Sequence, residues 1–361
     1  MSPSRRPAAL FAALAALLAA GLTLGLVEVV LRVVDYPPAT FSPWIRSDLF
    51  GFRLAPDIDV RMRGPEYDVR IQTNSLGMRD DEPGPKNKPR VMLIGDSFAM
   101  GYGVERGKLF ADLLEKDLGI DVEDMGTGGY EIVQQPRVLA EYGPRLSPDL
   151  VLYAMYLGND LSQNDEWEER ADGSLHNKTR EYPVRQPNEW KLVRLVHDGI
   201  YGIRKGRSEK EGEWLPYEGY LGLCEKDLGA EAIKDYADAE ALLVRVAEQS
   251  RRLRAPLLVL EIPYRSMVEP DAYTSLASKV PGLAERYDLT QPAREIGQRM
   301  TKDGIEHVDV TPNLVEEFKR SAKPLFYPID GHLTEAGHAA VARFLEPYVR
   351  DHLRPDADRH L

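Results

Sequence analysis

The residue in this sequence best suited to chemistry is a serine that directly follows a strongly apolar segment. Ser97 stands in the tetrapeptide GDSF, after residues 91–94, which are all apolar. A short apolar run stopped by Gly-Asp is typical of a buried parallel strand, and the next residues then lie at the carboxyl edge of the sheet. A serine hydroxyl is exposed there, and backbone N–H groups are available to an oxyanion. The same four residues also fit an ordinary strand-to-helix turn with a capping side chain.

A nucleophilic serine needs a base, and the base needs a carboxylate that orients it. Of the seven histidines, His332 is the strongest candidate, because Asp330 stands two residues before it in a Gly-containing loop ahead of the last predicted helix. In that loop the carboxylate can reach Nδ1 of His332 while Nε2 faces the serine. The other histidines lie in a long insertion, in a strand, or on or beyond the final helix. The same Asp and His also fit a simple capping loop.

Two further segments could supply hydrogen-bond donors to an oxyanion. The pair Gly128-Gly129 follows the second predicted strand and offers backbone N–H groups that no side chain obstructs, and Asn159, between Gly158 and Asp160 after the third, offers its amide. Losing one such donor typically lowers the rate by ~10²–10³-fold. Taken singly, each segment fits a turn better than an oxyanion donor.

The elements that would position these residues alternate between strand and helix from residue 90 onward. Apolar runs predict strands over residues 91–96, 120–126, 149–158, 256–263 and 305–310, and amphipathic spacing predicts helices over residues 105–118, 132–146, 231–254, 285–302 and 334–352. This alternation predicts an α/β fold: a parallel sheet of about five strands with helices on both faces, in three α/β/α layers. The carboxyl ends of such strands meet at one edge, where the candidate residues would gather.

The remaining segments define the predicted domain organisation. Residues 1–34 are predicted to be an anchor, residues 35–89 a stalk and loop-rich lead-in with short extended pieces such as 68–72, residues 90–352 the catalytic domain, and residues 353–361 a tail. Residues 161–230 interrupt the alternation, hold three of the four tryptophans and show one short amphipathic helix at 192–203. Loops of this length are uncommon unless functional. The insertion is therefore either a cap over the active site or a surface segment packed down by its aromatic residues.

The N-terminal segment predicts a membrane anchor. From Pro7 to Val27 there are 21 residues without a charge, enough for a helix to cross the ~30 Å apolar core of a bilayer. Arg5 and Arg6 precede this run, so the positive-inside rule places the N-terminus in the cytoplasm and the rest in the periplasm or outside the cell. A cleaved signal peptide is the alternative, but the run is longer than a usual signal core and no small-x-small cleavage site follows it.

Composition excludes several classes of function. The chain has 361 residues and a net charge of −12, which disfavours nucleic acid, because binding phosphates requires clustered Lys and Arg. Its single cysteine, Cys224, excludes an intramolecular disulfide, a Cys-based zinc site and a CxxC redox pair, and is expected to be a buried or incidental residue of the insertion. His332 and His338 are six apart, unlike the zinc ligands of HExxH, and no Walker A, GxGxxG or G-x-S-x-G sequence occurs. No metal or organic cofactor is expected.

Together, these blocks resemble the SGNH (GDSL-type) hydrolase superfamily. That family places its serine in a GDS block, a glycine in a second block, an asparagine in a third, and Asp with His in a last block before the C-terminal helix. The resemblance covers about residues 90–352 and implies a flavodoxin-like three-layer sheet. It also implies Ser97 as nucleophile, His332 as base, Asp330 as its partner, and an oxyanion hole formed by the N–H groups of Ser97 and Gly129 and the side chain of Asn159.

Three details differ from the usual blocks of the family. The last block is Asp-x-His instead of Asp-x-x-His, a spacing that resembles the alginate-type O-acetyltransferase branch. Asp124 stands where the second block usually has Asn, and Gly158 directly precedes Asn159. The upstream stretch TNSLGMR at residues 73–79 resembles one found in anchored bacterial members.

Three functions are consistent with the sequence. The first is a membrane-anchored serine esterase that hydrolyses short acyl or O-acetyl esters of a small molecule, lipid or glycan. The second is a polysaccharide O-acetyltransferase with the same three residues, which would need a membrane partner as acyl donor. The third is an anchored binding protein whose GDS site is vestigial. Labelling by a fluorophosphonate separates the two enzymes from the binding protein, and dependence on an acceptor separates the enzymes from each other.

Overall fold

The computed structural model describes residues 6–33, 44–162, 164–178, 190–193, 195–196 and 218–354. By internal contacts the chain divides into two units, of which one comprises Met1–Ser42 with Arg185–Leu215 and the other Pro43–Val184 with Pro216–Leu361. The first unit contains α1 (Arg6–Val33). Within α1, residues Phe11–Val33 are long and apolar enough to cross a membrane. A signal sequence has the same property, so the role of α1 as an anchor stays a prediction, as does its orientation.

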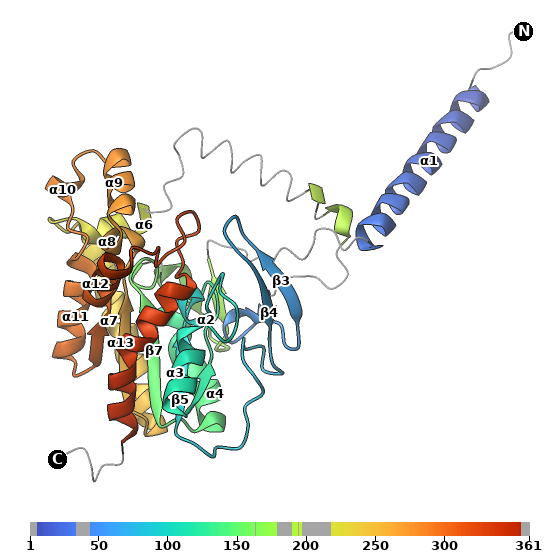
Figure 1. The fold of residues 1–361 in the computed structure, drawn as a ribbon. Coiled ribbons are helices and arrows are strands. Elements are labelled where there is room, and N and C mark those ends of the chain that lie inside the picture. The colour runs from blue at the N-terminus through green and yellow to red at the C-terminus, as the bar shows by residue number, and fades with distance from the viewer. Residues whose placement is uncertain are drawn as a thin grey trace, which may run out of the picture. The chain divides into compact units, whose positions relative to one another are not determined.

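The second unit is built on a parallel sheet of five strands (Figure 1). The spatial order is β11-β10-β7-β5-β6, formed by β5 (Arg90–Gly95), β6 (Asp121–Asp124), β7 (Leu150–Tyr156), β10 (Leu257–Ile262) and β11 (Glu306–Asp309). Numbered along the chain, these strands have the order 2-1-3-4-5 from one edge to the other, which is the flavodoxin-like order. All five predicted strands, and the predicted flavodoxin-like sheet, are therefore confirmed.

The three central strands, β5, β7 and β10, are buried on both faces and are apolar at nearly every position. In β5, Met92 and Ile94 belong to one hydrophobic cluster, whereas Val91 and Leu93 belong to the other. Helices α4 (Gln135–Leu146), α7 (Ala230–Leu253) and α11 (Gln291–Lys302) contribute to the first cluster, and helices α3 (Phe110–Leu118), α12 (Thr311–Ser321) and α13 (Glu335–Leu353) to the second. The result is the predicted three-layer α/β/α arrangement.

Several boundaries differ from the prediction. The helix predicted over 285–302 is two helices, α10 (Leu283–Arg286) and α11, because Asp288 accepts the backbone N–H of Thr290 in a turn and Pro292 fixes the first turn of α11. The helix predicted from residue 105 begins only at Phe110. The helices α8 (Arg265–Val268) and α9 (Pro270–Lys279) were not predicted, because each is too short to show clear helical periodicity of apolar residues.

The lead-in, which was predicted to be rich in loops, contains two β-hairpins. β1 (Trp44–Ser47) pairs with β2 (Gly51–Leu54), and β3 (Asp59–Arg63) pairs with β4 (Asp68–Gln72), the one extended piece that was predicted. Their inward residues are buried completely, as at Phe52 and Ile71. These hairpins belong to the same unit as the sheet.

Part of the predicted insertion also packs into this unit. Residues 164–178 form η2 (Asn164–Glu166) and the hairpin of β8 (Trp167–Glu169) and β9 (Leu175–Asn177), and the ring of Trp167 lies in the same hydrophobic cluster as Phe52. α6 (Glu218–Leu221) and η3 (Gly222–Cys224) return the chain to α7. The helix predicted over 192–203 lies mostly outside the described residues, so the predicted cap is neither supported nor contradicted.

Candidate active site

Ser97 is held at the carboxyl end of β5 by a close approach between strands. Gly95 has φ +155°, and a Cβ placed on it would lie 2.7 Å from the carbonyl oxygen of Ala154 in the adjacent β7. Glycine is therefore required at this position. The buried Asp96 caps the next turn by accepting the backbone N–H of Phe98 at 2.8 Å, and α2 (Ser97–Met100) begins at the serine. The block GDS thus caps the helix and places the half-buried Ser97 at its first residue.

The structure brings Ser97, His332 and Asp330 into one hydrogen-bonded chain. The distance from Ser97 Oγ to His332 Nε2 is 2.7 Å, and that from His332 Nδ1 to Asp330 Oδ1 is 2.6 Å. Asp330 and His332 lie in a tight loop before α13, in which Gly331 has φ +88° and its N–H donates to the carbonyl of Tyr327. With Nδ1–H donating to the carboxylate, Nε2 is free to accept the serine proton.

Aromatic rings and burial fix the histidine and its carboxylate. The His332 imidazole contacts the rings of Phe98 and Tyr102, with centroids 4.9 and 4.7 Å away. The His332 and Asp330 side chains are only 21% and 16% exposed. Burial works to raise the pKa of Asp330, but hydrogen bonds from His332 and Tyr67 hold this pKa below its ordinary value. Asp330 therefore stays ionised and orients the imidazole.

The two segments that contain the predicted oxyanion donors differ in their contacts. Gly128 is adjacent, since a Cβ placed on it would lie 3.7 Å from Ser97 Cβ and 3.7 Å from the Trp44 indole. Gly129 has φ +86°, and within the described ranges its N–H donates to no other group of the protein. Asn159 uses one amide hydrogen to reach Asp96 Oδ2 at 3.1 Å, which leaves its second N–H uncommitted. Their role as donors stays a prediction.

Two buried carboxylates lie next to the candidate site residues in the sequence. Asp96 and Asp160 are both 0% exposed. Burial raises the pKa of Asp96 to about 6, against the stabilising effect of Phe98 N–H, the nearby His332 and Asn159. Burial and the charge of Asp96 raise the pKa of Asp160 well above its ordinary value. The Asp160 carboxyl accepts hydrogen bonds from the hydroxyl of Tyr153 and the N–H of Tyr156.

The other reactive groups have structural partners. His338 is buried and accepts the backbone N–H of Phe110 on Nδ1 at 3.1 Å. His307 pairs with the buried Glu261 at 2.6 Å. The buried Cys224 lies 3.3 Å from the hydroxyl of Tyr264, and burial raises the pKa of its thiol to about 12. In the described part of the chain no group of three or more His, Cys, Asp or Glu residues is arranged to hold a metal ion.

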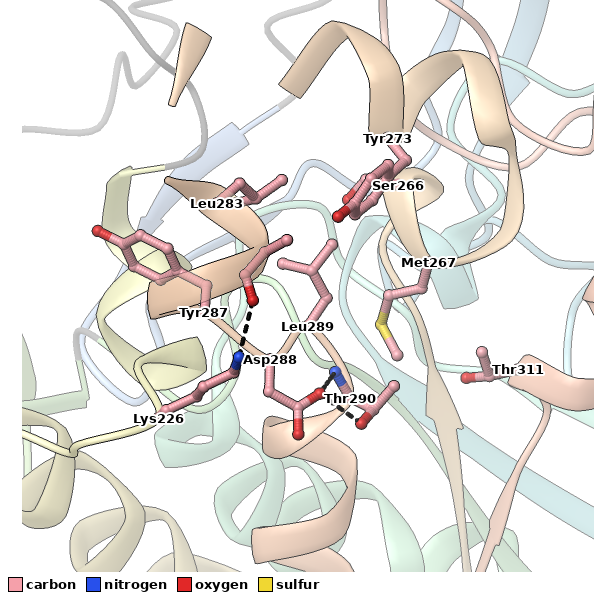
Figure 2. A pocket seen from close by; sticks show the side chains of 11 residues that line it. Lys226, Ser266, Met267, Tyr273, Leu283, Tyr287, Asp288, Leu289, Thr290 and Thr311 are labelled. Carbon is pink, nitrogen blue, oxygen red and sulfur yellow. Dashed lines mark hydrogen bonds between the residues drawn. The ribbon is translucent and has the colours of Figure 1, made fainter. Parts of the chain in front are cut away.

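A cavity of about 490 Å³ lies beyond the ends of β10 and β11, at the same edge of the sheet (Figure 2). Its apolar lining includes Met267, Leu283 and Leu289. The rim carries Lys226, whose Nζ donates to the Ala284 carbonyl at 2.7 Å, and an Asp288 carboxylate bonded to Thr290, as the dashed lines in Figure 2 show. Ser97 does not line this cavity, so the reacting ester is not expected there.

One family model matches the C-terminal part of the chain. Residues 223–359 match the family model described as the SGNH hydrolase-like domain of acetyltransferase AlgX. This part of the chain therefore belongs to an SGNH hydrolase-like domain. The matched range includes the Asp-x-His block but neither Ser97 nor Asn159. No curated protein matches the chain.

Solved structures with a similar course of the chain include several esterases. One is the acetyl xylan esterase AlAXEase (13% identity, 72% of this chain and 99% of that chain, TM-score 0.41). Others are a catalytic mutant of an acetylxylan esterase from Geobacillus stearothermophilus (14%, 76% and 99%, 0.40) and a family 2 carbohydrate esterase with its carbohydrate-binding domain from Corynascus thermopiles (17%, 75% and 68%, 0.41).

Sequence reasoning missed the residues that reach the site from the lead-in. Tyr67 and Glu66 contact the loop of Asp330, and Trp44 donates from Nε1 to the carbonyl of Gly128 at 3.2 Å. Arg79, 1% exposed, donates to the carbonyls of residues 100, 101 and 104, just after α2. The stretch at residues 73–79 was the one available signal, but it did not indicate what Arg79 contacts.

Proposed function

We propose that this chain is a serine esterase that cleaves carboxylic esters, with short acyl or O-acetyl groups as the expected substrates. The observation that carries the proposal is the continuous hydrogen-bonded chain from Ser97 Oγ through His332 to Asp330. Such a chain supplies a nucleophile, a base within 2.7 Å of its proton, and a carboxylate that fixes the base. The substrate is an acylated small molecule, lipid or glycan, and the residues in the site require no cofactor for this chemistry.

The reaction would proceed through an acyl-enzyme. Ser97 Oγ attacks the ester carbonyl while its proton passes to His332 Nε2. Collapse of the tetrahedral intermediate breaks the bond to the alcohol, which leaves with the proton from Nε2. Water then attacks the acyl carbon, gives its proton to Nε2, and releases the acid and Ser97. Asp330 stabilises the imidazolium that forms in each half of the reaction.

The negative oxygen of the intermediate would be held by three N–H donors, those of Ser97, Gly129 and the Asn159 side chain. Ser97 begins α2, so its N–H has no acceptor within the helix. The N–H of Gly129 and the second N–H of Asn159 complete the proposed hole. Asp96, by accepting from Asn159 at 3.1 Å, fixes the amide so that its nitrogen faces inward.

Hydrolysis of an ester series tests the proposal. The full chain in detergent is supplied with p-nitrophenyl esters from acetate to decanoate, alongside Ser97→Ala and His332→Ala. We expect the wild type to prefer short acyl groups and each variant to lose about 10⁴-fold or more in kcat. His307→Ala serves as the control, since His307 pairs with Glu261 and not with the serine. Equal rates in the wild type and Ser97→Ala would refute the proposal.

A second candidate is an O-acetyltransferase that uses the same three residues. It is favoured by the Asp-x-His spacing and by the match of residues 223–359 to a family described as acetyltransferase. The acyl group would pass from Ser97 to a glycan hydroxyl instead of water, and the acyl donor would come from a membrane partner. Adding an oligosaccharide acceptor to the ester assay separates the two: transfer yields acetylated glycan, whereas hydrolysis releases acetate at a rate that ignores the acceptor.

The N-terminal helix would place this chemistry at a membrane. We propose that α1 anchors the domain, with Arg5 and Arg6 on the cytoplasmic side and the catalytic domain outside. Protease added to intact cells or spheroplasts is expected to degrade the domain. Complete protection, with degradation only after lysis, would contradict this orientation.

A further inference from the structure

The turn of the β3–β4 hairpin contacts the loop that holds the Asp330–His332 pair. Tyr67 donates from its hydroxyl to Asp330 Oδ2 at 2.8 Å. The neighbouring Glu66 accepts two backbone N–H groups of that loop on Oε2, those of Ile329 and Asp330, each at 2.9 Å. Residues 66–67 thus hold both the carboxylate and the backbone of Asp330, although more than 260 residues separate them along the chain.

Aromatic packing fixes Tyr67 in this position. Its ring lies 5.3 Å from that of Tyr327 and 6.0 Å from that of Tyr102, which in turn contacts the His332 imidazole. A Cβ placed on Gly103 would lie 2.8 Å from the Tyr67 ring, so the ring packs directly on the backbone after α2. The hydroxyl of Tyr327 donates to the Gly103 carbonyl at 2.9 Å, which ties the two segments together.

We propose that Tyr67 and Glu66 are positioning residues of the active site. Through them the β3–β4 hairpin, which precedes the predicted catalytic domain, holds Asp330 in place to orient His332. This inference rests on the proposed function, because it assigns these residues to the same reaction. Oδ1 of Asp330 is used by His332, and Tyr67 satisfies Oδ2, so both carboxylate oxygens are held. Glu66 fixes the position of Asp330 by accepting two backbone N–H groups of its loop.

The hydroxyl of Tyr67 also stabilises the charge of Asp330. Burial, with the nearby Tyr102 and Asp330, raises the pKa of Tyr67, so the phenol stays a donor. Removing this donor raises the pKa of Asp330, and the carboxylate is then protonated at a higher pH than in the wild type. The other titratable groups around the pair are Tyr102, Tyr327, Asp96, Glu66 and His338, all of which remain in the variant.

Tyr67→Phe tests the assignment, with Tyr348→Phe on α13 as the matched control. We expect kcat for p-nitrophenyl acetate to fall roughly tenfold to a hundredfold, with KM within about twofold, because one hydrogen bond to a charged group is lost while the ring remains. The acid limb of the pH–rate profile should move to higher pH. Tyr348→Phe should match the wild type in both respects. A Tyr67→Phe rate within twofold of the wild type, with an unmoved acid limb, would overturn the proposal.

Two Glu66 variants separate geometry from charge. Glu66→Gln retains a carbonyl oxygen that accepts both N–H groups and should keep most of the activity, whereas Glu66→Ala should lose it in kcat. Equal losses in the two variants would contradict the positioning role of Glu66.

One readout is independent of turnover. The ¹³C resonance of the Asp330 carboxyl should titrate at higher pH in Tyr67→Phe than in the wild type, and an unchanged titration would overturn the role of Tyr67. A wild type without Ser97-dependent turnover would instead refute the proposed function, while this titration still decides whether Tyr67 holds the carboxylate.

Discussion

His338 provides a quantitative test of how the core around the active site is built. This residue is 1% exposed, packs against the ring of Phe110 at a centroid distance of 5.5 Å, and accepts the Phe110 N–H on Nδ1. Burial lowers its pKa to about 3, and the charges of Arg79 and His332 act in the same direction. The imidazole is therefore neutral in the folded protein at every pH above that value. It joins α13 to α3 and takes no proton from Ser97.

The size of the effect follows from linkage. In the unfolded chain a histidine has a pKa near 6.5, so between pH ~6.5 and ~3 the unfolded state binds a proton that the folded state excludes. The folded pKa is lowered, and the free energy of unfolding therefore falls as the pH falls through this window. One pKa unit corresponds to about 1.36 kcal/mol, so at pH 5 His338 lowers the stability by about 2 kcal/mol relative to neutral pH.

The measurement compares the wild type with His338→Asn, in which the Asn Oδ1 replaces Nδ1 as acceptor for the Phe110 N–H. Urea unfolding of the full chain in detergent at pH 7.5, 6 and 5 gives the difference in unfolding free energy between the two proteins. The difference cancels the contribution of Asp80 and Asp96, whose pKa values burial raises to about 7 and about 6. Between pH 7.5 and 5 it should shift by about 2 kcal/mol in favour of the variant. Parallel pH profiles would refute a neutral, buried His338.

Three further changes are expected to have distinct effects. Arg79→Met removes the donors to the carbonyls of residues 100, 101 and 104 and should lower the unfolding free energy by about 3–5 kcal/mol in urea, with a smaller loss in Arg79→Lys; an unchanged midpoint would contradict this role. Gly129→Ala should cost about 1 kcal/mol through its left-handed φ and also slow ester hydrolysis, whereas Gly107→Ala, at a similar φ of +84° with open space around it, should cost stability alone. Asp330→Asn should lower kcat by about 10⁴-fold while leaving the thermal midpoint within a few degrees, and full activity would remove Asp330 from the mechanism.

The sheet was predictable because its strands carry an unambiguous pattern. Residues 91–94 and 150–155 are almost wholly apolar, as strands buried on both faces must be, and a glycine follows each within three residues. The placement of Ser97 followed from the first of these strands, and that of His332 from the loop before the last predicted helix. The structure brings together what the spacing indicated, with Ser97 Oγ 2.7 Å from His332 Nε2.

The remainder was hidden because its signals are tertiary. The lead-in reads as a Pro- and Gly-rich segment, and nothing local to Tyr67 indicates a partner more than 260 residues away. Asn74 explains part of the stretch at residues 73–79: its Oδ1 accepts the N–H groups of Leu76 and Met78, and this turn directs Arg79 into the core. Short helices such as α8 lack a full period of apolar spacing, so periodicity could not detect them.

The most direct test of the central claim is to locate a covalent adduct. The full chain is treated with a fluorophosphonate at neutral pH, digested, and analysed by mass spectrometry, beside Ser97→Ala and His332→Ala. The account predicts phosphonylation of Ser97 in the wild type, none in Ser97→Ala, and much slower labelling in His332→Ala. A wild type that labels no faster than Ser97→Ala, or an adduct on another residue, would contradict the assignment of Ser97 as the nucleophile.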